Sequence, residues 1–222
     1  AISILTTFGI LFSILFEAIE FFKLRSFWYF ITGTTWSPGV IDSQFGALPI
    51  FAGTFVITVI ALGVAIPIGL GSAIYMSEYA SPKLRDYLKP LLEVLAGIPS
   101  VVYGFFAAIT VAPLVVKIAE AIGLEATFNS ALASGVVMGI MIIPTISSLS
   151  DDVIRSVPDS QRKASFGLGM THGETIRDIV LPSAMPGIIS ASLLALSKAL
   201  GETMVVVMAA GLRPNLSWNP LE

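Results

Sequence analysis

An ammonium and a carboxylate lie within a long apolar stretch near the C-terminal end. Lys198 and Glu202 are four residues apart, and Thr203 adds a hydroxyl beside them. An ionisable side chain near the bilayer centre costs about 2.5–3.5 kcal/mol, so it usually faces a bundle interior and has a partner or a task. The spacing is that of an intrahelical ion pair or of a site on an anion's path. Glu93, at the start of another apolar stretch, is either an interfacial charge or a further residue on such a path.

Composition restricts the class of protein. Of the 222 residues, 55% are hydrophobic and 12% are charged, whereas a soluble domain has about 25% charged residues. The composition therefore predicts an integral membrane protein. With no cysteine and one histidine, the chain offers neither a thiolate metal site nor a Ser-His-Asp triad, and we expect no metal and no cofactor. It lacks a phosphate-binding Gly-x-x-x-x-Gly-Lys-[Ser/Thr] loop, so ATP hydrolysis is not expected, and nucleic acid is not an expected ligand.

Apolar stretches predict an all-α, polytopic transmembrane bundle, because a span needs about 20 apolar residues to cross roughly 30 Å of hydrocarbon. No soluble domain is left over, so residues 1–222 are expected to form a single transmembrane domain with a polar loop at about 151–185. Five stretches qualify or nearly do: 1–22, 43–77 with its helix at about 49–76, 94–116, 129–149 and 186–210.

Basic residues predict the orientation, since loops rich in Lys and Arg stay in the cytoplasm. Seven basic residues lie in the loops after the second and fourth stretches, against four on the other face, which favours a cytoplasmic position for the first group. The seven are Lys83, Arg85, Lys89, Arg155, Arg162, Lys163 and Arg177; the four are Lys23, Arg25, Lys117 and Arg213.

Small residues at a spacing of four predict where helices pack closely in lipid. Ala65, Gly69 and Ala73 form one such series in the second stretch, and Gly135 and Gly139 form another in the fourth. We expect both series to face neighbouring helices.

The polar loop contains two helix signals. Ser156-x-x-Asp159 is typical of a helix start, with Pro158 tolerated in the first turn, and Gly169 stands where a left-handed residue would end that helix. Thr171-x-x-Glu174 is a capping box that predicts a second short helix.

The second helix is expected to end before Pro182, because the residue before a proline is pushed out of the α region. Two short helices at a glycine corner also suit a DNA-reading helix-turn-helix, but the loop lacks a basic surface and its flanks are lipid-like. An amphipathic interfacial connector remains an alternative.

The loop resembles the Glu-Ala-Ala (EAA) loop of the membrane subunits of binding-protein-dependent ABC importers. Lys163 stands where this family usually has Glu, and Ser165 where it has the second Ala. The residues that carry the resemblance are Lys163, Ala164, Ser165 and Gly169, then after nine residues Ile179, Leu181 and Pro182.

Two further stretches resemble the phosphate-specific permeases of that family, and the Met after Gly-Glu-Thr is similar to their PstC-type subunit. The stretches are 95–104, Leu-Ala-Gly-Ile-Pro-Ser-Val-Val-Tyr-Gly, and 198–204, Lys-Ala-Leu-Gly-Glu-Thr-Met. Lys198 replaces the Arg common in that family; an ammonium still attracts phosphate but lacks the bidentate guanidinium fork.

The resemblance implies a permease of the MetI-like fold in the cell inner membrane, with no enzymatic activity of its own. The loop, including Thr171 and Glu174, would dock into a cytoplasmic ATPase dimer. A sister permease would complete a heterodimer, and a periplasmic phosphate-binding protein would deliver phosphate. The family has one more span beyond Trp218, so the chain is expected to be a fragment.

Two other functions stay open. A permease for another oxyanion, such as sulfate or molybdate, would share the loop and differ along the translocation path. A secondary transporter or channel would need no ATPase, and the spacing of the loop argues against it.

Overall fold

The computed structural model describes residues 2–39, 43–212 and 214–221. Ala1 and Arg213, which the sequence analysis assigned to the first span and the last loop, lie outside the described residues. The chain forms two compact units, Ala1–Gly53 with Arg213–Trp218 and Thr54–Leu212 with Asn219–Glu222.

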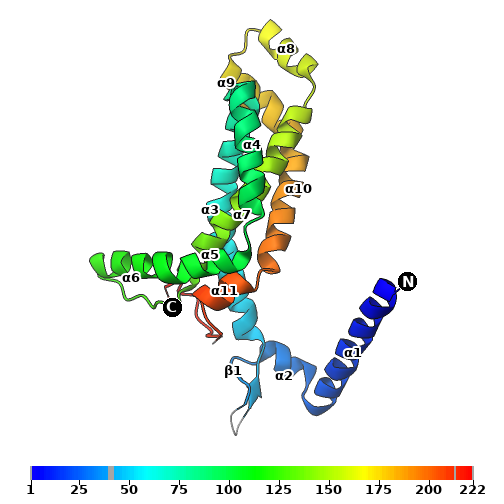
Figure 1. Ribbon diagram of the computed structural model, residues 1–222, viewed down its shortest axis with the longest axis vertical. Helices are drawn as coiled ribbons and strands as arrows, with labels where there is room; N and C mark the ends of the chain where they lie inside the picture. The colour runs from blue at the N-terminus through cyan, green and yellow to red at the C-terminus, as the bar shows by residue number, and fades with distance from the viewer. Residues whose placement is uncertain (1, 40–42, 213, 222) are drawn as a thin grey trace. The chain divides into compact units, whose positions relative to one another are not determined.

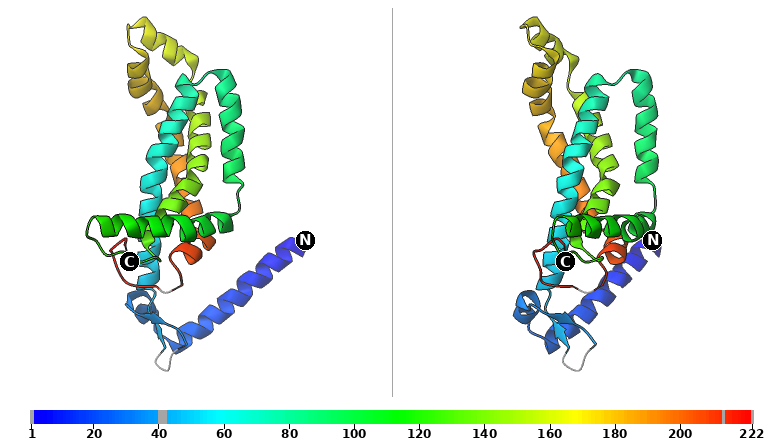
Figure 2. Two further views of the ribbon diagram at one scale, coloured as in Figure 1. Left: turned by 60° about the vertical axis from the view of Figure 1, so that its left-hand side comes forward. Right: turned by 90° about the vertical axis from the view of Figure 1, so that its left-hand side faces the viewer.

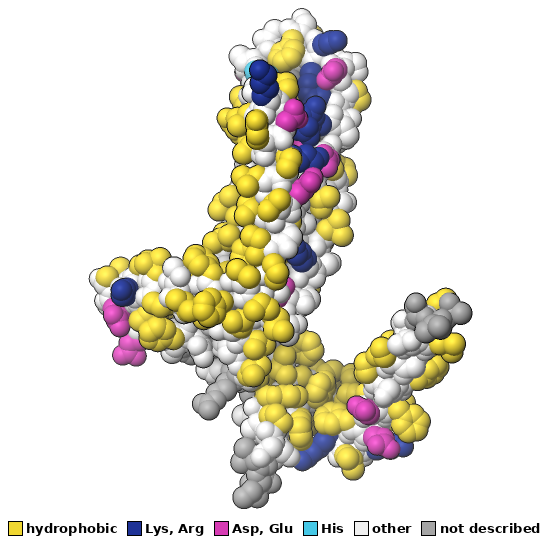
Figure 3. All heavy atoms as spheres, in the orientation of Figure 1, with side chains coloured by type: hydrophobic (Ala, Val, Ile, Leu, Met, Phe, Trp, Pro, Cys, Tyr) yellow, Lys and Arg dark blue, Asp and Glu magenta, His cyan; other side chains and the backbone are white. Residues whose placement is uncertain are grey.

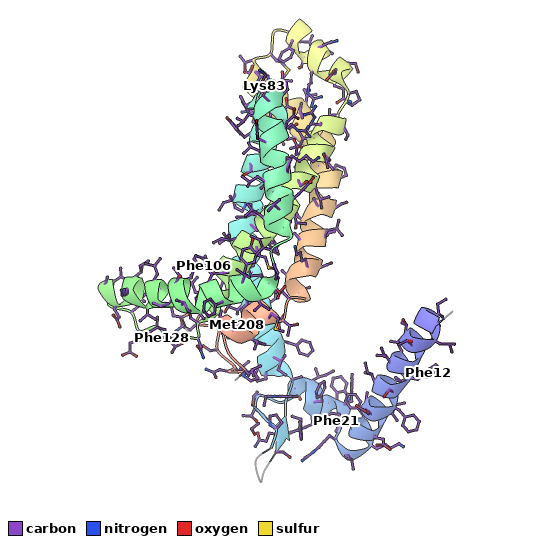
Figure 4. All side chains as sticks on the ribbon, viewed as in Figure 1. Phe12, Phe21, Lys83, Phe106, Phe128 and Met208 are labelled. Carbon is purple, nitrogen blue, oxygen red and sulfur yellow. The ribbon has the colours of Figure 1, made fainter. Side chains whose placement is uncertain are left out.

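The first unit contains one span and a short hairpin. Its elements are α1 (Ile2–Leu24), α2 (Phe27–Thr32), the antiparallel strands β1 (Trp36–Ser37) and β2 (Gln44–Phe45), and the start of α3 (Leu48–Ile74). Phe21, labelled in Figure 4, meets Phe30 and Phe45 edge to face at centroid distances of 5.7 and 5.6 Å. Aromatic rings of α1, α2 and β2 therefore pack together in this unit.

The second unit is a bundle of long helices (Figures 1 and 2). From α3 the chain continues through the π turn η1 (Tyr75–Tyr79) to α4 (Pro82–Ala96), then α5 (Ser100–Phe106), η2 (Ala107–Val111) and α6 (Ala112–Ala121). After α7 (Ala131–Ser156) come α8 (Asp159–Gly167), α9 (His172–Thr175), η3 (Ile176–Val180), α10 (Leu181–Leu200) and α11 (Met204–Ala209).

The described residues include five helical stretches that are long and apolar enough to cross a membrane, which confirms the predicted fold class. The first two match the predicted spans closely at both ends. The fourth begins near its predicted start but continues to Ser156 instead of ending at about 149, and the last is His172–Leu200 where 186–210 was predicted. The five are Ile4–Leu24, Leu48–Tyr79, Ser100–Ala121, Ala131–Ser156 and His172–Leu200.

The predicted start of the third span at Val94 is wrong. Val94 belongs to α4, which ends at Ala96. Pro99 follows closely, has an extended ψ of 135°, and disfavours the α region in the residue before it. The segment α5–η2–α6 then runs across the long axes of α3, α7 and α10 in every view (Figures 1 and 2).

Helix α7 is the centre of the bundle and packs through the predicted small residues. A Cβ on Gly139 would lie 2.9 Å from the carbonyl oxygen of Ala61, and a Cβ on Gly69 would lie 2.9 Å from Cβ of Ile146. Ala65 and Ala73 are fully buried. The prediction that both series of small residues face neighbouring helices is confirmed, and the main chains of α3 and α7 approach closely because no side chain separates them.

We predict that Gly139→Ala destabilises the bundle by about 1–3 kcal/mol, because the added methyl meets main-chain atoms that cannot rotate away. Gly63→Ala is the matched control, since a Cβ on Gly63 has no atom within 4 Å. The midpoints of SDS-induced unfolding should fall for the first variant and stay or rise for the second. Equal midpoints for both would contradict the packing.

Candidate functional site

The polar segment, Pro158–Pro182, lies at one end of the bundle, where the charged side chains gather in Figure 3. Its first helix is α8, which begins at Asp159 and not at Ser156. Ser156 is the last residue of α7, and its hydroxyl donates to the carbonyl of Val153 at 2.7 Å. The predicted start at Ser156 was wrong because α7 continues through that residue. Val157 is extended before Pro158, so the next helix can begin only at Asp159.

The corner between α8 and α9 is as predicted. Gly169 has a φ of +84°, a left-handed conformation that a side chain strains. Thr171 and Glu174 form the capping box: the Glu174 carboxylate accepts the Thr171 N–H at 2.8 Å, and the Glu174 N–H donates to the Thr171 hydroxyl at 3.4 Å.

The second helix does not end before Pro182. Helices α9, η3 and α10 form one stretch, His172–Leu200, with Pro182 in the first turn of α10. A proline lacks the N–H of a regular turn and its ring collides with the carbonyl four residues earlier. We interpret the wide turn η3, Ile176–Val180, as the adjustment that lets the helix pass through Pro182.

Ser165 fastens α8 to α9. Its hydroxyl donates to the carbonyl of Arg162 at 2.8 Å and lies 2.9 Å from the hydroxyl of Thr175. Both hydroxyl-bearing residues are buried, Ser165 being 3% exposed. The Ser165 hydroxyl thus has hydrogen-bond partners within the polar segment itself. Of the remaining loop residues named above, Lys163, Ala164 and Pro182 are exposed, and Ile179 and Leu181 are half-buried.

Arg162 holds the polar segment on the bundle, a role that sequence reasoning missed. Its guanidinium donates to the carbonyls of Ile154, at 3.0 Å, and Val157, at the end of α7. It also forms an ion pair of 2.8 Å with Glu78 in η1, whose side chain is 6% exposed. A cation at a helix C-terminus is favoured by the unpaired carbonyls there. The partners are 84 residues apart, so no local pattern could reveal them.

An apolar surface covers the corner. The ring of His172 stacks on Phe166 and meets Tyr79 edge to face, at centroid distances of 6.2 and 5.1 Å. Leu168, next to the corner, is 84% exposed. Phe166, on the other side of Gly167, is 46% exposed, so the corner presents apolar side chains to its surroundings.

Two more ion pairs join α4 to α7 at the same end. The Arg85 guanidinium donates to both oxygens of Asp151, the shortest bond being 2.6 Å, and Asp151 is fully buried. This hydrogen bond raises the pKa of Arg85, so the guanidinium stays charged. Lys89 pairs with Asp152, whose side chain is 52% exposed. The two basic loops therefore share one end of the bundle, as predicted.

Lys198 and Glu202 do not share one uninterrupted helix. Helix α10 ends at Leu200, and Lys198 is in its last turn. The Glu202 carboxylate instead accepts the N–H groups of Met204, at 3.0 Å, and Val205, at 3.3 Å, at the start of α11. Within the described part of the chain no ion pair joins the two residues. The alternative of an intrahelical ion pair is therefore not realised, because the helix ends at Leu200 and the Glu202 carboxylate caps the next one.

A small cavity lies beside Glu202, about 70 Å³ in volume. Two threonines of α3 are among the residues that line it, a feature that the sequence alone did not indicate. Lys198 is half-buried, Thr203 is exposed, and Glu93 lies on the exposed side of α4. The residues that line the cavity are Thr54, Ile57, Thr58, Met138, Ala199, Leu200, Glu202 and Val206.

The break between α4 and α5 and the break between α10 and α11 are neighbours, since α5 packs along α11. A Cβ on Gly104 would lie 2.9 Å from the sulfur of Met208, labelled in Figure 4. The stretches that resemble phosphate permeases, 95–104 and 198–204, are thereby brought together.

Residues 65–215 match the model of the family described as "Binding-protein-dependent transport system inner membrane component". The chain belongs to this family. It is therefore a multi-pass membrane protein of the permease class and not an enzyme.

Named relatives agree with the family. A probable ABC transporter permease protein, YqgH, of Bacillus subtilis is 37% identical over 82% of this chain and 58% of its own length. The phosphate transport system permease protein PstC of Mesorhizobium japonicum is 36% identical over 82% of this chain and 60% of its own length. The phosphate transport system permease protein PstC 1 of Mycobacterium bovis is 34% identical over 88% of this chain and 66% of its own length. The chain thus spans about three fifths of these relatives.

Among solved structures, the MetNI methionine ABC transporter in inward-facing conformations matches 70% of this chain and 68% of its own, with a TM-score of 0.47 and 20% identity.

We predict that Asp151→Ala destabilises the protein by about 3–5 kcal/mol, because it leaves the Arg85 guanidinium without its buried counter-ion. Asp152→Ala, one residue away, removes an exposed partner and should cost less than about 1 kcal/mol. SDS-induced unfolding of both variants gives the comparison. Similar losses for the two would show that burial of Asp151 is unimportant.

Proposed function

We propose that this chain is a permease subunit of an ATP-driven importer that moves inorganic phosphate across the cell inner membrane. The observation that supports it most is the polar segment, because its spacing and its corner suit a docking element for a cytoplasmic ATPase. A sister permease and a periplasmic phosphate-binding protein would complete the transporter. Two relatives are named as phosphate permeases, and the stretches 95–104 and 198–204 resemble such permeases.

The docking surface would be the corner itself. Leu168 and Phe166 are exposed beside Gly169, and Ser165 with Thr175 hold the two helices at a fixed angle behind them. Closure of the ATPase dimer would push on this surface. Since α9 continues without a break into α10, the push would reach the interruption at Gly201 along one helix.

The path for the anion would pass Lys198 and Glu202. The Lys198 ammonium forms no ion pair with Glu202 and can attract phosphate. Glu202 fixes the turn between α10 and α11 through its bonds to two N–H groups, and it lines the small cavity with Thr54 and Thr58. Glu93 and Thr203 are proposed to line the same path. Alternating access is then a population shift between two packed states of the bundle.

Another oxyanion is the second candidate substrate, because sulfate and molybdate share the charge and shape that such a path recognises. Phosphate uptake by proteoliposomes that contain the complete transporter, with sulfate and molybdate as competitors, tests the choice. Uptake inhibited by unlabelled phosphate alone supports phosphate. Uptake that sulfate or molybdate abolishes supports the alternative, and uptake without ATP would support a secondary transporter.

We predict that Gly169→Val weakens association with the ATPase about tenfold, because a left-handed conformation costs a side chain about 1–2 kcal/mol. Gly167→Val is the control, since Gly167 has an ordinary backbone conformation and open space for a Cβ. Co-purification of the ATPase with each variant measures the effect. If both variants retain the ATPase equally well, the segment is not the docking element.

For the path, we expect Lys198→Ala to lower phosphate uptake about tenfold, since a hydrogen bond to a charged group contributes roughly 1.5–3 kcal/mol. Lys198→Arg keeps the charge and should retain uptake. Lys117→Ala, an exposed lysine on α6, is the control for loss of a positive charge. Transport and assembly are measured in the same membranes. Normal uptake by Lys198→Leu with Glu202→Leu would exclude a role of either residue in the path.

A further inference from the structure

We propose that the ion pair between Arg162 and Glu78 couples the polar segment to α3, so that a movement of the docked segment shifts α3 together with α7 and α10. Arg162 and Glu78 would thus be positioning residues. The proposal rests on the proposed function, because the segment has a reason to move only if an ATPase binds there.

Helix α3 does not directly precede or follow the polar segment along the chain, unlike α7 and α10. Helix α7 leads into α8 through Val157 and Pro158, and α9 continues into α10. Helix α3 ends at η1 and is followed by α4, so η1 reaches the segment through side chains. Glu78 provides two of these contacts, to Arg162 at 2.8 Å and to Nε2 of His172 at 3.9 Å.

The geometry of Arg162 suits the transmission of a displacement. One guanidinium bonds the last carbonyls of α7 and the carboxylate of η1 at once. Its planar fork fixes the direction of each bond, unlike a lysine ammonium. Glu78 is 6% exposed, so water competes little for the pair. If α8 shifted alone, two nearly buried charges would separate. The arrangement in which α8, α7 and η1 move together is therefore favoured.

Tyr79 adds a second contact beside the pair, since its ring meets His172 edge to face at 5.1 Å. His172 is in the first turn of α9, whereas Arg162 is on α8. Both arms of the segment thus touch the end of α3, and the ion pair supplies the directional part of that contact.

The test compares Arg162→Met, Glu78→Gln and the double variant in the reconstituted transporter. We measure co-purification of the ATPase and, separately, phosphate taken up per ATP hydrolysed. Each single change should leave co-purification within about twofold and lower the uptake per ATP about tenfold, and the double variant should be no worse than either single one. Arg162→Lys keeps the charge opposite Glu78 and should give an intermediate ratio.

The matched controls are Lys89→Met and Asp152→Asn, which break an ion pair between α4 and α7 at the same end of the bundle. They should leave uptake per ATP within about twofold. An unchanged ratio in the Arg162 and Glu78 variants, or additive losses in the double variant, would overturn the coupling role alone. Loss of ATPase binding together with uptake would reduce the pair to a support of the docking surface. Failure of the unmodified chain to retain the ATPase would overturn both proposals.

Discussion

The constraint on which this bundle depends is that backbone polar groups inside a membrane must find partners within the protein. Every interruption of a helix therefore needs a group that satisfies it. The Glu202 carboxylate accepts the first N–H groups of α11, and the Ser130 hydroxyl accepts the Ala133 N–H at the start of α7. Pro182 is preceded by the wide turn η3. Glu202 therefore caps α11 at the position where the sequence placed a residue of an anion path. Capping and a role in the path both require a carboxylate beside the break between α10 and α11.

The polar end of the bundle obeys the complementary rule that a buried charge needs a counter-charge. Asp151 is fully buried and faces Arg85, and Glu78 is nearly buried and faces Arg162. Each pair joins elements distant in sequence, α4 to α7 and η1 to α8. Replacing such a pair by well-packed apolar residues often costs no stability, whereas removing one partner leaves an uncompensated buried charge and is strongly destabilising.

The polar segment combines a rigid interior with an exposed apolar surface. The Gly169 corner, the Thr171–Glu174 box and the Ser165–Thr175 contact define its shape, while Leu168 remains 84% exposed. This preorganisation means that a partner would bind without first ordering a loop. The continuous helical stretch from His172 to Leu200, which includes the wide turn η3, then connects that surface to the interruption near Glu202.

Local patterns in the sequence determined much of this protein. Apolar length predicted five spans, small residues at a spacing of four predicted which faces of α3 and α7 pack against neighbouring helices, and the Gly169 corner with its capping box was predicted from residues within a few positions of one another. Tertiary structure decided the rest. Local signals predicted three features wrongly: the start of α8, the end of a helix before Pro182 and the pairing of Glu202. In each case the continuation of a neighbouring helix, or the need to cap one, outweighed the local pattern. Arg162–Glu78 and Arg85–Asp151 join residues 84 and 66 positions apart. The physical reason is that propensity acts within a turn or two, whereas the pairing of buried charges depends on which helices the packing brings together.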